Sequence, residues 1–185
     1  MIWRLFRPRP RGRSIDELYG AIVAQARSPV FYRDYRVPDT MEGRFDLIVL
    51  HLVLVIERLG RDSTAGQGTG QQLFDAFCRD LDHNLREMGV GDLAVPKRMR
   101  RFGEAFYGRQ AAYLAAFAAA DRSELEKALQ RNIFPVTQDE LCAARLADYV
   151  RAARRQFAEL ADGALLAGQL SFPAPDAIAE AMIHA

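Results

Sequence analysis

Residues 41–59, MEGRFDLIVLHLVLVIERL, form the stretch that decides how the rest of this 185-residue chain packs. Thr40 in front of it suits a helix N-cap, and Gly60 behind it suits a helix end. The sequence therefore predicts one helix across the stretch. Its longest run without Asp, Glu, Lys or Arg, residues 47–56, is too short to cross a bilayer, which requires about 20 apolar residues.

The polar side chains of this helix form two stripes. At 100° per residue, Arg44, His51 and Arg58 share one narrow stripe, and Asp46 and Glu57 lie nearly opposite. Apolar side chains fill both arcs between the stripes. A helix that is apolar on two sides either lies in the middle of a bundle or presents one side to a partner. We expect the central position, and we expect His51 to be a hydrogen-bonded core residue rather than a ligand or a catalytic base.

The other segments also have helical rather than alternating periodicity. The sequence therefore predicts an all-α fold, a single-domain bundle of about six helices plus a short C-terminal helix. Residues 1–13 are expected to form a basic flexible tail, 14–170 the all-helical domain and 171–185 a C-terminal extension. The remaining predicted helices span residues 15–27, 71–88, 96–119, 123–134 and 138–166, and the glycine-rich residues 61–70 are predicted as a flexible loop.

Three pairs with the spacing of a capping box mark expected helix starts. In such a box, a Ser or Thr side chain and a Glu three residues later each bond to the other's backbone N–H. The pairs are Ser14 with Glu17, Ser123 with Glu126 and Thr137 with Glu140.

The composition is that of an ordinary globular domain, with a formal net charge of +1 at pH 7. A chain of this length buries enough surface to fold without a disulfide or a structural metal. Cys78 and Cys142 lie on the apolar faces of predicted helices, without the spacing of metal ligands, and are expected to be buried, reduced thiols. The small net charge argues against a general nucleic-acid-binding protein.

The sequence offers no constellation for catalysis. His51, His83 and His184 stand far apart, and neither cysteine has a histidine close to it in the sequence. The glycines of residues 61–70 lack the spacing and the flanking strand of a phosphate-binding loop. We therefore expect a protein that is not an enzyme and that uses no cofactor, metal or small-molecule substrate.

The N-terminus, MIWRLFRPRPRGRS, is basic and lacks the apolar core of a signal peptide. A cytoplasmic bacterial protein is the simplest interpretation. The N-terminal residues are expected to form a disordered tail, and the alternative is a weak foot on anionic lipid, because apolar side chains such as Trp3 alternate with Arg4 and Arg7.

The stretch REMGVGDLAVPKRMRRFGEAFYGR, residues 86–109, is rich in glycine and in basic side chains. Gly89 suits the positive φ of a Schellman ending, in which Val90 folds back on Leu85, and Pro96 suits the first turn of the next helix. A corner between two helices therefore explains part of the stretch. Gly103 falls inside the apolar stripe of the predicted helix 96–119, which suggests that another backbone packs closely there.

Gly108 falls on the opposite, outward side of the same helix, where glycine costs about 1 kcal/mol relative to alanine. Lys97 and Arg101 share that side, and Arg98 and Arg109 flank the aromatic edge. This pattern predicts close approach by another protein or by an anionic surface. Arg109→Ala and Gly108→Leu are expected to leave the fold intact and weaken partner binding. The alternative is a helical nucleic-acid- or ribosome-binding protein that uses the basic face of residues 97–109.

Three segments carry a resemblance to a known family. They are FYRDYRVPDTMEGRFDLIVLHLVLVIERL, LFDAFCRDLDHNLREMGVGDLAVPKRM and FGEAFYGRQAAYLAAF, within residues 31–120. The chain resembles the ubiquinol–cytochrome c chaperones, which assist assembly of the cytochrome bc1 complex, the respiratory complex III. The most specific part is the combination of LREMGVGDL with VPKRM and FYGR.

The resemblance implies an all-helical chaperone with no chemistry of its own, whose client is newly made cytochrome b. It also implies contact with the ribosome and a peripheral position at the cytoplasmic face of the inner membrane. An exposed apolar groove rimmed by charge, formed by the helices 41–59 and 96–119, is the surface expected for such a client. The resemblance implies further partner-binding residues besides Lys97, Arg98 and Arg101. They are Asp80, Asp82, Arg86, Glu87, Gly89, Asp92, Phe106, Tyr107, Gly108, Arg109 and Tyr113.

Overall fold

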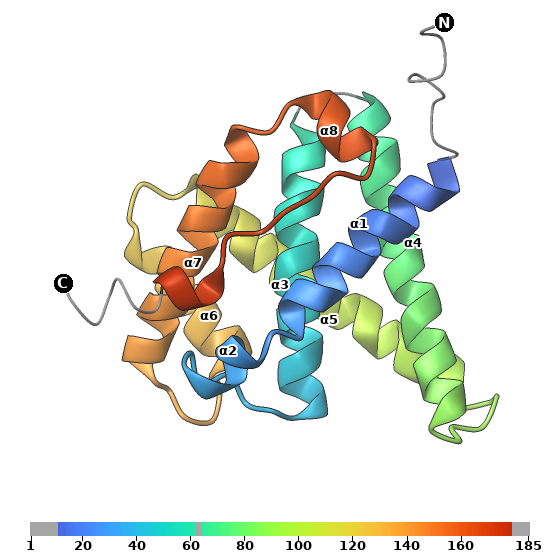
Figure 1. Ribbon diagram of the computed structural model, residues 1–185. Coiled ribbons are helices and arrows are strands. Elements are labelled where there is room, and N and C mark those ends of the chain that lie inside the picture. Colours follow the sequence, from blue (N-terminus) through green and yellow to red (C-terminus); the bar gives the residue numbers. More distant parts are fainter. Residues whose placement is uncertain (1–10, 62–63, 179–185) are drawn as a thin grey trace, which may run out of the picture.

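The computed structural model describes residues 11–61 and 64–178 and folds them into one helical domain. No strand occurs among these residues, which confirms the predicted all-α class. The helices follow one another around a common core (Figure 1). They are α1 (Arg11–Ala26), α2 (Pro29–Arg33), α3 (Met41–Gly60), α4 (Thr64–Glu87), α5 (Val95–Ala118), α6 (Ser123–Ile133), α7 (Glu140–Ala158) and α8 (Asp162–Leu166).

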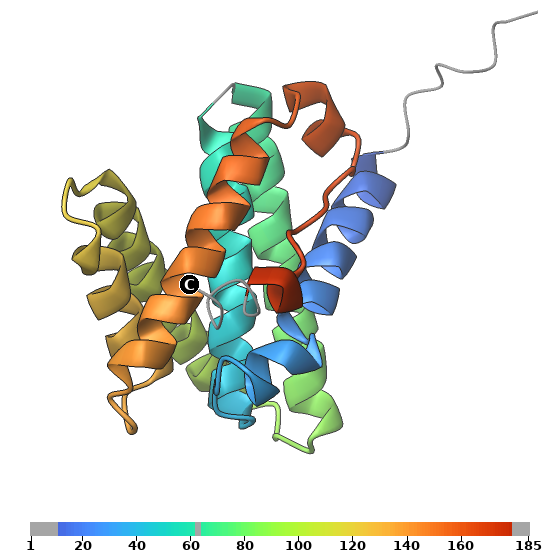
Figure 2. The same cartoon turned by 60° about the vertical axis from the view of Figure 1, so that its left-hand side comes forward.

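Helix α3 runs through the middle of the bundle, as the two apolar arcs of its sequence predict. It packs against α1, α4, α5, α6 and α7, and Figures 1 and 2 show it enclosed from several sides. Even the polar residues Asp46, His51 and Arg58 are buried. Because a buried polar group needs a partner, each of these three side chains ties α3 to a neighbouring element or to its own backbone.

His51 is the hydrogen-bonded core histidine that the sequence predicts. Its Nδ1 lies 2.7 Å from the Leu47 carbonyl, so Nδ1 carries the proton, and its Nε2 accepts from the Tyr149 hydroxyl at 3.0 Å. Gln25 in turn donates to the Tyr149 oxygen at 3.0 Å. Burial lowers the pKa of His51 to about 4, so the ring is neutral at pH 7.

Arg58 caps the C-terminal end of α7. Its guanidinium donates to the carbonyls of Phe157 and Leu160, both at 2.7 Å. The last carbonyls of a helix lack partners within that helix, and Arg58 supplies two donors there. The stripe of Arg44, His51 and Arg58 therefore does not mark a surface, since its two C-terminal members lie in the interior.

The predicted loop 61–70 is wrong, because α4 begins at Thr64. A Cβ atom added to Gly66 would lie 2.1 Å from the Leu59 carbonyl oxygen, and one added to Gly70 would lie 3.5 Å from the Ile56 side chain. These glycines let α4 start directly against the end of α3. Tertiary packing therefore overrides the low helix propensity of the stretch.

Several predicted caps also differ from the structure. Helix α1 already begins at Arg11, so residues 11–13 are helical rather than tail, and Ser14 is buried inside the helix instead of capping it. Residues 1–10, expected as the rest of the tail, lie outside the described residues. At the start of α6, Asp121 replaces the predicted box by accepting from both the backbone N–H and the hydroxyl of Ser123. The predicted cap Thr40 is confirmed, since its side chain accepts from the Gly43 N–H.

The last predicted helix is divided in the structure. Asp139, rather than Thr137, caps α7 by accepting from the Cys142 N–H at 2.9 Å, and α7 ends at Ala158 before α8 begins. The short helix α2 was not predicted, although Pro29 suits its first position. Cys142 is buried, Cys78 is half-buried, and both are free thiols.

The corner between α4 and α5 has the predicted Schellman geometry. Gly89 has a φ of 76°, and the Val90 N–H donates to the Leu85 carbonyl at 3.0 Å. The expectation for Gly103 is wrong, because an added Cβ would meet nothing within 4 Å. The bundle leaves this side of α5 open.

The described part of the segment after α8 runs along the bundle (Figure 1). The Phe172 ring contacts the rings of His51 and Phe157 edge-on, at centroid distances of 5.1 and 5.2 Å. The Tyr35 hydroxyl donates to the Pro175 carbonyl at 2.8 Å. Phe172 and Ile178 of this segment are therefore partly buried against the core, and residues 179–185 lie outside the described part.

Candidate protein-binding groove

A groove of about 520 Å³ opens where the N-terminal half of α3, the C-terminal half of α4 and the start of α5 meet. Its floor is apolar and largely aromatic, and we call it the α3–α4–α5 groove. The apolar residues that line it are Met41, Phe45, Ile48, Phe77, Leu81, Leu85, Met88 and Phe102.

Three phenylalanines, one from each helix, build the floor. The Phe45 ring of α3 lies 5.9 Å from that of Phe77 in α4 and 5.1 Å from that of Phe102 in α5. Phe77 is buried, whereas Phe45 and Phe102 are partly exposed toward the groove. Rings at these distances hold one another in place, so the groove has a preformed apolar surface.

Charged side chains surround this floor. Arg27, Asp39, Arg44, Asp80 and Glu87 line the groove together with Thr40 and Asn84. Arg44 pairs with Asp39 at 2.7 Å, and Asp80 accepts a hydrogen bond from Tyr19 at 2.8 Å. The rim therefore carries both signs of charge, and part of it is fixed by contacts within the protein.

Exposed apolar side chains continue from the groove toward the α4–α5 corner. Met41 and Met88 at the groove are 60% and 50% exposed, and Leu93 in the corner is 98% exposed. Methionine side chains adapt to differently shaped partners because they are unbranched and polarisable. This end of the molecule is therefore suited to an apolar partner.

The structure separates the site residues expected from the sequence into four places. Asp80 and Glu87 line the groove. At the adjacent corner, Arg86 pairs with Asp82 at 2.7 Å and with Asp92 at 2.6 Å. These ion pairs tie the end of α4 to the turn at Gly89, so they shape the corner beside the groove.

Three expected contact residues of α5 face the core instead. Phe106 and Tyr113 are 1% and 0% exposed, and the Arg109 Nε lies 2.6 Å from the Asp46 carboxylate of α3. Asp46 is buried, and burial raises its pKa to about 6 against the opposing effect of Arg109. Arg109 ties α5 to α3, and Phe106 packs against Phe74 and Phe77 of α4. Phe106 and Tyr113 are too deeply buried to touch a partner directly, whereas partner contact by the partly exposed Arg109 stays a prediction.

The remaining expected residues lie on the outward side of α5. Lys97, Arg98, Arg101, Tyr107 and Gly108 are exposed. A Cβ added to Gly108 would meet nothing within 4 Å, as expected for an outward glycine. The Tyr107 ring also packs against Phe74 at 5.5 Å, so only part of it is free.

The residues that form the floor of the groove were not among the binding residues predicted from the sequence. No pattern in the sequence singled out Phe45, Phe77, Leu81 or Phe102 as binding residues. The signal that pointed to them was the second apolar arc of the helix at residues 41–59, which can remain open only where no neighbouring helix covers it. Within the described residues, no group of His, Cys, Asp and Glu side chains is placed to hold a metal ion. None of the helices described is long and apolar enough to cross a membrane.

An all-helical bundle with an open apolar groove has the architecture of a protein-binding protein. A sequence model of the family described as "Ubiquinol-cytochrome C chaperone" matches residues 33–172. The chain belongs to this family, whose members are assembly chaperones of the cytochrome bc1 complex.

Individual relatives agree with this assignment. The protein of Xenopus laevis described as "Ubiquinol-cytochrome-c reductase complex assembly factor 1" is 26% identical over 156 residues, which are 83% of this chain and 77% of that protein. The crystal structure of the Cbp3 homolog from Brucella abortus is 40% identical in sequence, with a TM-score of 0.82. The match covers 90% of this chain and 92% of that one. The predicted family and fold class are both confirmed.

Proposed function

We propose that this chaperone binds newly made cytochrome b and that the α3–α4–α5 groove receives an apolar helix of this client. The observation that carries the proposal is the preformed aromatic floor of Phe45, Phe77 and Phe102 within a charged rim. Cytochrome b is an integral membrane subunit of the complex, so its helices expose apolar side chains until they are inserted and packed.

The size of the groove defines how much of a client helix it takes. A volume of about 520 Å³ accommodates several side chains from one face of a helix, not the whole helix. Recognition then follows the helix-in-groove mode, with anchors at positions i, i+3 or i+4, and i+7. The charged rim, which includes Arg27, Asp39 and Glu87, offers partners of both signs to the polar ends of a membrane helix.

The proposal includes no chemical step on the client. The protein shields apolar surface, and its effect is to keep cytochrome b available for assembly. We place it in the cytoplasm, at the cytoplasmic face of the inner membrane, where it would meet the client as it leaves the ribosome. Membership of a family of assembly chaperones supports this role.

The comparisons do not favour the alternative of a nucleic-acid-binding protein. Of the basic strip expected at residues 97–109, Arg109 is engaged by Asp46, and Arg100 lies 3.6 Å from Glu104. Lys97, Arg98 and Arg101 of the outward side have no ion-pair partner among residues 11–61 and 64–178, and they form a shorter row than the sequence suggested.

A pull-down from detergent-solubilised membranes tests the proposal. The groove bait carries Met41→Glu and Met88→Glu, because both side chains are exposed at the groove and their replacement should not affect the core. The control bait carries Val136→Glu and Leu141→Glu, which are 91% and 64% exposed and do not line the groove. We expect cytochrome b with the wild-type and control baits and a loss of at least about tenfold with the groove bait, the equivalent of 1.4 kcal/mol.

A third bait, Gly108→Leu, tests the outward side of α5 separately. Loss of cytochrome b with this bait alone would place the client on the outer surface of α5 and not in the groove. Recovery of RNA in place of cytochrome b, sensitive to salt, would contradict the proposed function as a whole.

A further inference from the structure

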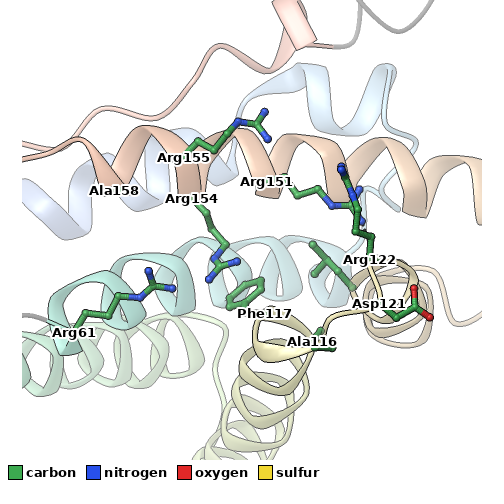
Figure 3. Close-up of a pocket in the computed structure, with 11 residues that line it drawn as sticks. Arg61, Ala116, Phe117, Asp121, Arg122, Arg151, Arg154, Arg155 and Ala158 are labelled. Carbon is green, nitrogen blue, oxygen red and sulfur yellow. Dashed lines mark hydrogen bonds between the residues drawn. The ribbon is translucent and has the colours of Figure 1, made fainter.

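A second hollow, of about 450 Å³, lies at the other end of α3 and α5 from the groove (Figure 3). Five arginines line it, and we call it the arginine pocket. The rest of its wall is formed by the Asp121 carboxylate and by apolar residues at the end of α5 and on α6 and α7: Ala116, Phe117, Ala119, Leu125 and Ala158. The arginines are Arg61, Arg122, Arg151, Arg154 and Arg155.

Arg154 is held in place by two contacts. Its guanidinium carbon lies 4.2 Å from the centroid of the Phe117 ring (Figure 3). One terminal nitrogen donates to Glu57 at 3.2 Å. Glu57 also pairs with Arg61, so two arginines share a single carboxylate. The Arg154 Nε is buried and has no acceptor within the described part of the chain. Arg154 is therefore fixed and still has unused hydrogen-bonding capacity.

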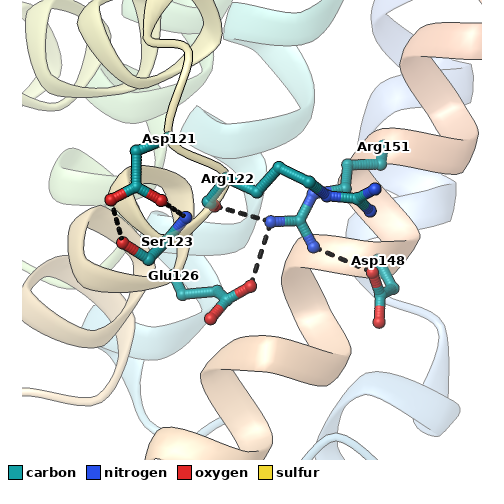
Figure 4. A network of polar contacts seen from close by, with 6 residues as sticks. All are labelled: Asp121, Arg122, Ser123, Glu126, Asp148 and Arg151. Atoms are coloured by element: carbon teal, nitrogen blue, oxygen red, sulfur yellow. Dashed lines mark hydrogen bonds and ion pairs between the residues drawn. The ribbon is translucent and has the colours of Figure 1, made fainter.

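Arg151 is fixed by three acceptors from different elements (Figure 4). It donates to Asp148 at 2.8 Å, to the backbone carbonyl of Arg122 at 2.7 Å and to Glu126 at 3.0 Å. These bonds tie the turn before α6 to α7 and hold Arg122 at the edge of the pocket. The Asp121 carboxylate is occupied by Ser123, so it leaves the Arg122 guanidinium unpaired.

The pocket carries more positive charge than its surroundings neutralise. The side chains of Arg122 and Arg155 have no hydrogen-bond or ion-pair partner among residues 11–61 and 64–178. The sequence places Arg151, Arg154 and Arg155 at positions i, i+3 and i+4 of α7, so all three project from one side of that helix. The hollow therefore combines two fixed guanidinium groups, of Arg151 and Arg154, with two unpaired ones, of Arg122 and Arg155. This arrangement suits a ligand with several anionic oxygens.

We propose that the arginine pocket binds a phosphate group. A phosphate offers more oxygen acceptors than a carboxylate and accepts from several guanidinium groups at once. The volume exceeds that of a single phosphate, and the Phe117 and Leu125 wall can contact the organic part of a phosphate ester. Two sources supply this chemistry, the headgroup of an anionic phospholipid and a soluble phosphorylated compound. The site is independent of the groove, so it stands or falls separately from the proposed function.

The test is a titration of the purified protein with inorganic phosphate, at constant ionic strength, followed by NMR or calorimetry. The variant is Arg122→Gln/Arg155→Gln, because neither side chain contributes a contact to the described fold. The matched control is Arg79→Gln/Arg131→Gln, which removes the same charge from exposed positions outside the pocket. We expect saturable phosphate binding that the first variant weakens by about tenfold or more and the control does not.

Sedimentation with phosphatidylcholine vesicles, with and without phosphatidylglycerol, distinguishes the two sources. Binding to the anionic vesicles that Arg122→Gln/Arg155→Gln abolishes would identify a lipid headgroup. Phosphate binding without any such vesicle binding would identify a soluble ligand. No phosphate binding, or equal binding by wild type and both variants, would overturn the proposal.

Discussion

Asp46 and Arg109 form the ion pair on which the contact between α3 and α5 depends. The Asp46 side chain is 6% exposed and that of Arg109 is 23% exposed, at a distance of 2.6 Å. Tyr113 beside them is fully buried. A buried carboxylate is tolerated while its partner is present, and removal of that partner leaves an uncompensated charge.

Arg109→Ala is therefore expected to destabilise the fold, which replaces the expectation from the sequence that this variant folds normally. We expect the free energy of unfolding to fall by about 3 kcal/mol, the cost of breaking a buried pair. Urea denaturation monitored by circular dichroism measures this change. The control, Arg101→Ala, removes an exposed arginine with no partner among the described residues and should change stability little. Equal stability of the two variants would show that the ion pair does not support the fold.

The pH dependence of the free energy of unfolding provides a second test of how Asp46 is buried. Burial raises the pKa of Asp46 from 3.8 to about 6, so the folded protein binds this proton more tightly, and the stability contribution of Asp46 falls as pH rises from about 4 to 6. Burial lowers the pKa of His51 from 6.5 to about 4, so its contribution rises with pH over nearly the same range. The two slopes oppose each other in the wild type.

Asp46→Asn removes one of the two opposing slopes. Unfolding free energies between pH 4 and 6.5 should then rise more steeply with pH than in the wild type, by about 1 kcal/mol per pH unit. Asp16→Asn, at an exposed carboxylate, is the control. A slope unchanged by Asp46→Asn would mean that the folded protein does not raise the pKa of Asp46.

The sequence predicted the burial of His51 but not the role of Arg109. His51 lies within an apolar run, and that pattern alone favours the core. Arg109 lies at the edge of an amphipathic helix. At such a position the sequence does not distinguish an arginine in solvent from one that reaches a distant buried carboxylate, here that of Asp46. The ion pair depends on the angle between α3 and α5, which only the folded structure defines.

Among the elements, α4 shows how packing determines a helix start. Its first two turns contain Gly66, Gly68 and Gly70, a composition that predicts a loop. Gly66 faces α3, where a Cβ would meet the Leu59 carbonyl oxygen, whereas Gly68 is exposed and has nothing within 4 Å. Two glycines in the same turns of one helix therefore have different roles.

Alanine substitutions at these two positions should have opposite effects. We expect Gly66→Ala to lower the free energy of unfolding by about 2 kcal/mol, because the new methyl group forces α4 away from α3. Gly68→Ala should raise it by up to about 1 kcal/mol, because alanine favours a helix interior. Thermal unfolding of both variants measures the difference. If Gly66→Ala were as stable as Gly68→Ala, the close approach of α3 and α4 would be wrong.

Helix periodicity predicted most of the elements but not their connections. Amphipathic stripes in α4, α5 and α7 are long enough to define a helix without knowledge of the fold. Caps were less predictable, because Asp121 and Asp139 compete with nearby Ser and Thr residues for the same backbone donors. Which of them caps depends on where the preceding chain enters the helix.

Across the whole molecule, α3 and α5 connect two surfaces of different character. The α3–α4–α5 groove at one end is apolar, and the arginine pocket at the other end is cationic. The all-α class followed from the sequence, because every long segment has the same periodicity. The family resemblance led us to expect a groove between α3 and α5, but its floor could not be predicted, because Phe45, Phe77 and Phe102 come from three helices and converge only after the bundle forms. The arginine pocket did not follow from the sequence either, because its residues come from α5, α6, α7 and the end of α3.

The most direct test of the proposed function is to locate cytochrome b on the surface of the chaperone in cells. A photo-crosslinking amino acid placed at Met88 in the groove, and at Val136 as the control, would capture whatever lies next to each position during assembly of the complex. We expect a crosslink to cytochrome b from position 88 and none from position 136. A crosslink from position 136 alone, or none from position 88 while cytochrome b is being made, would contradict it.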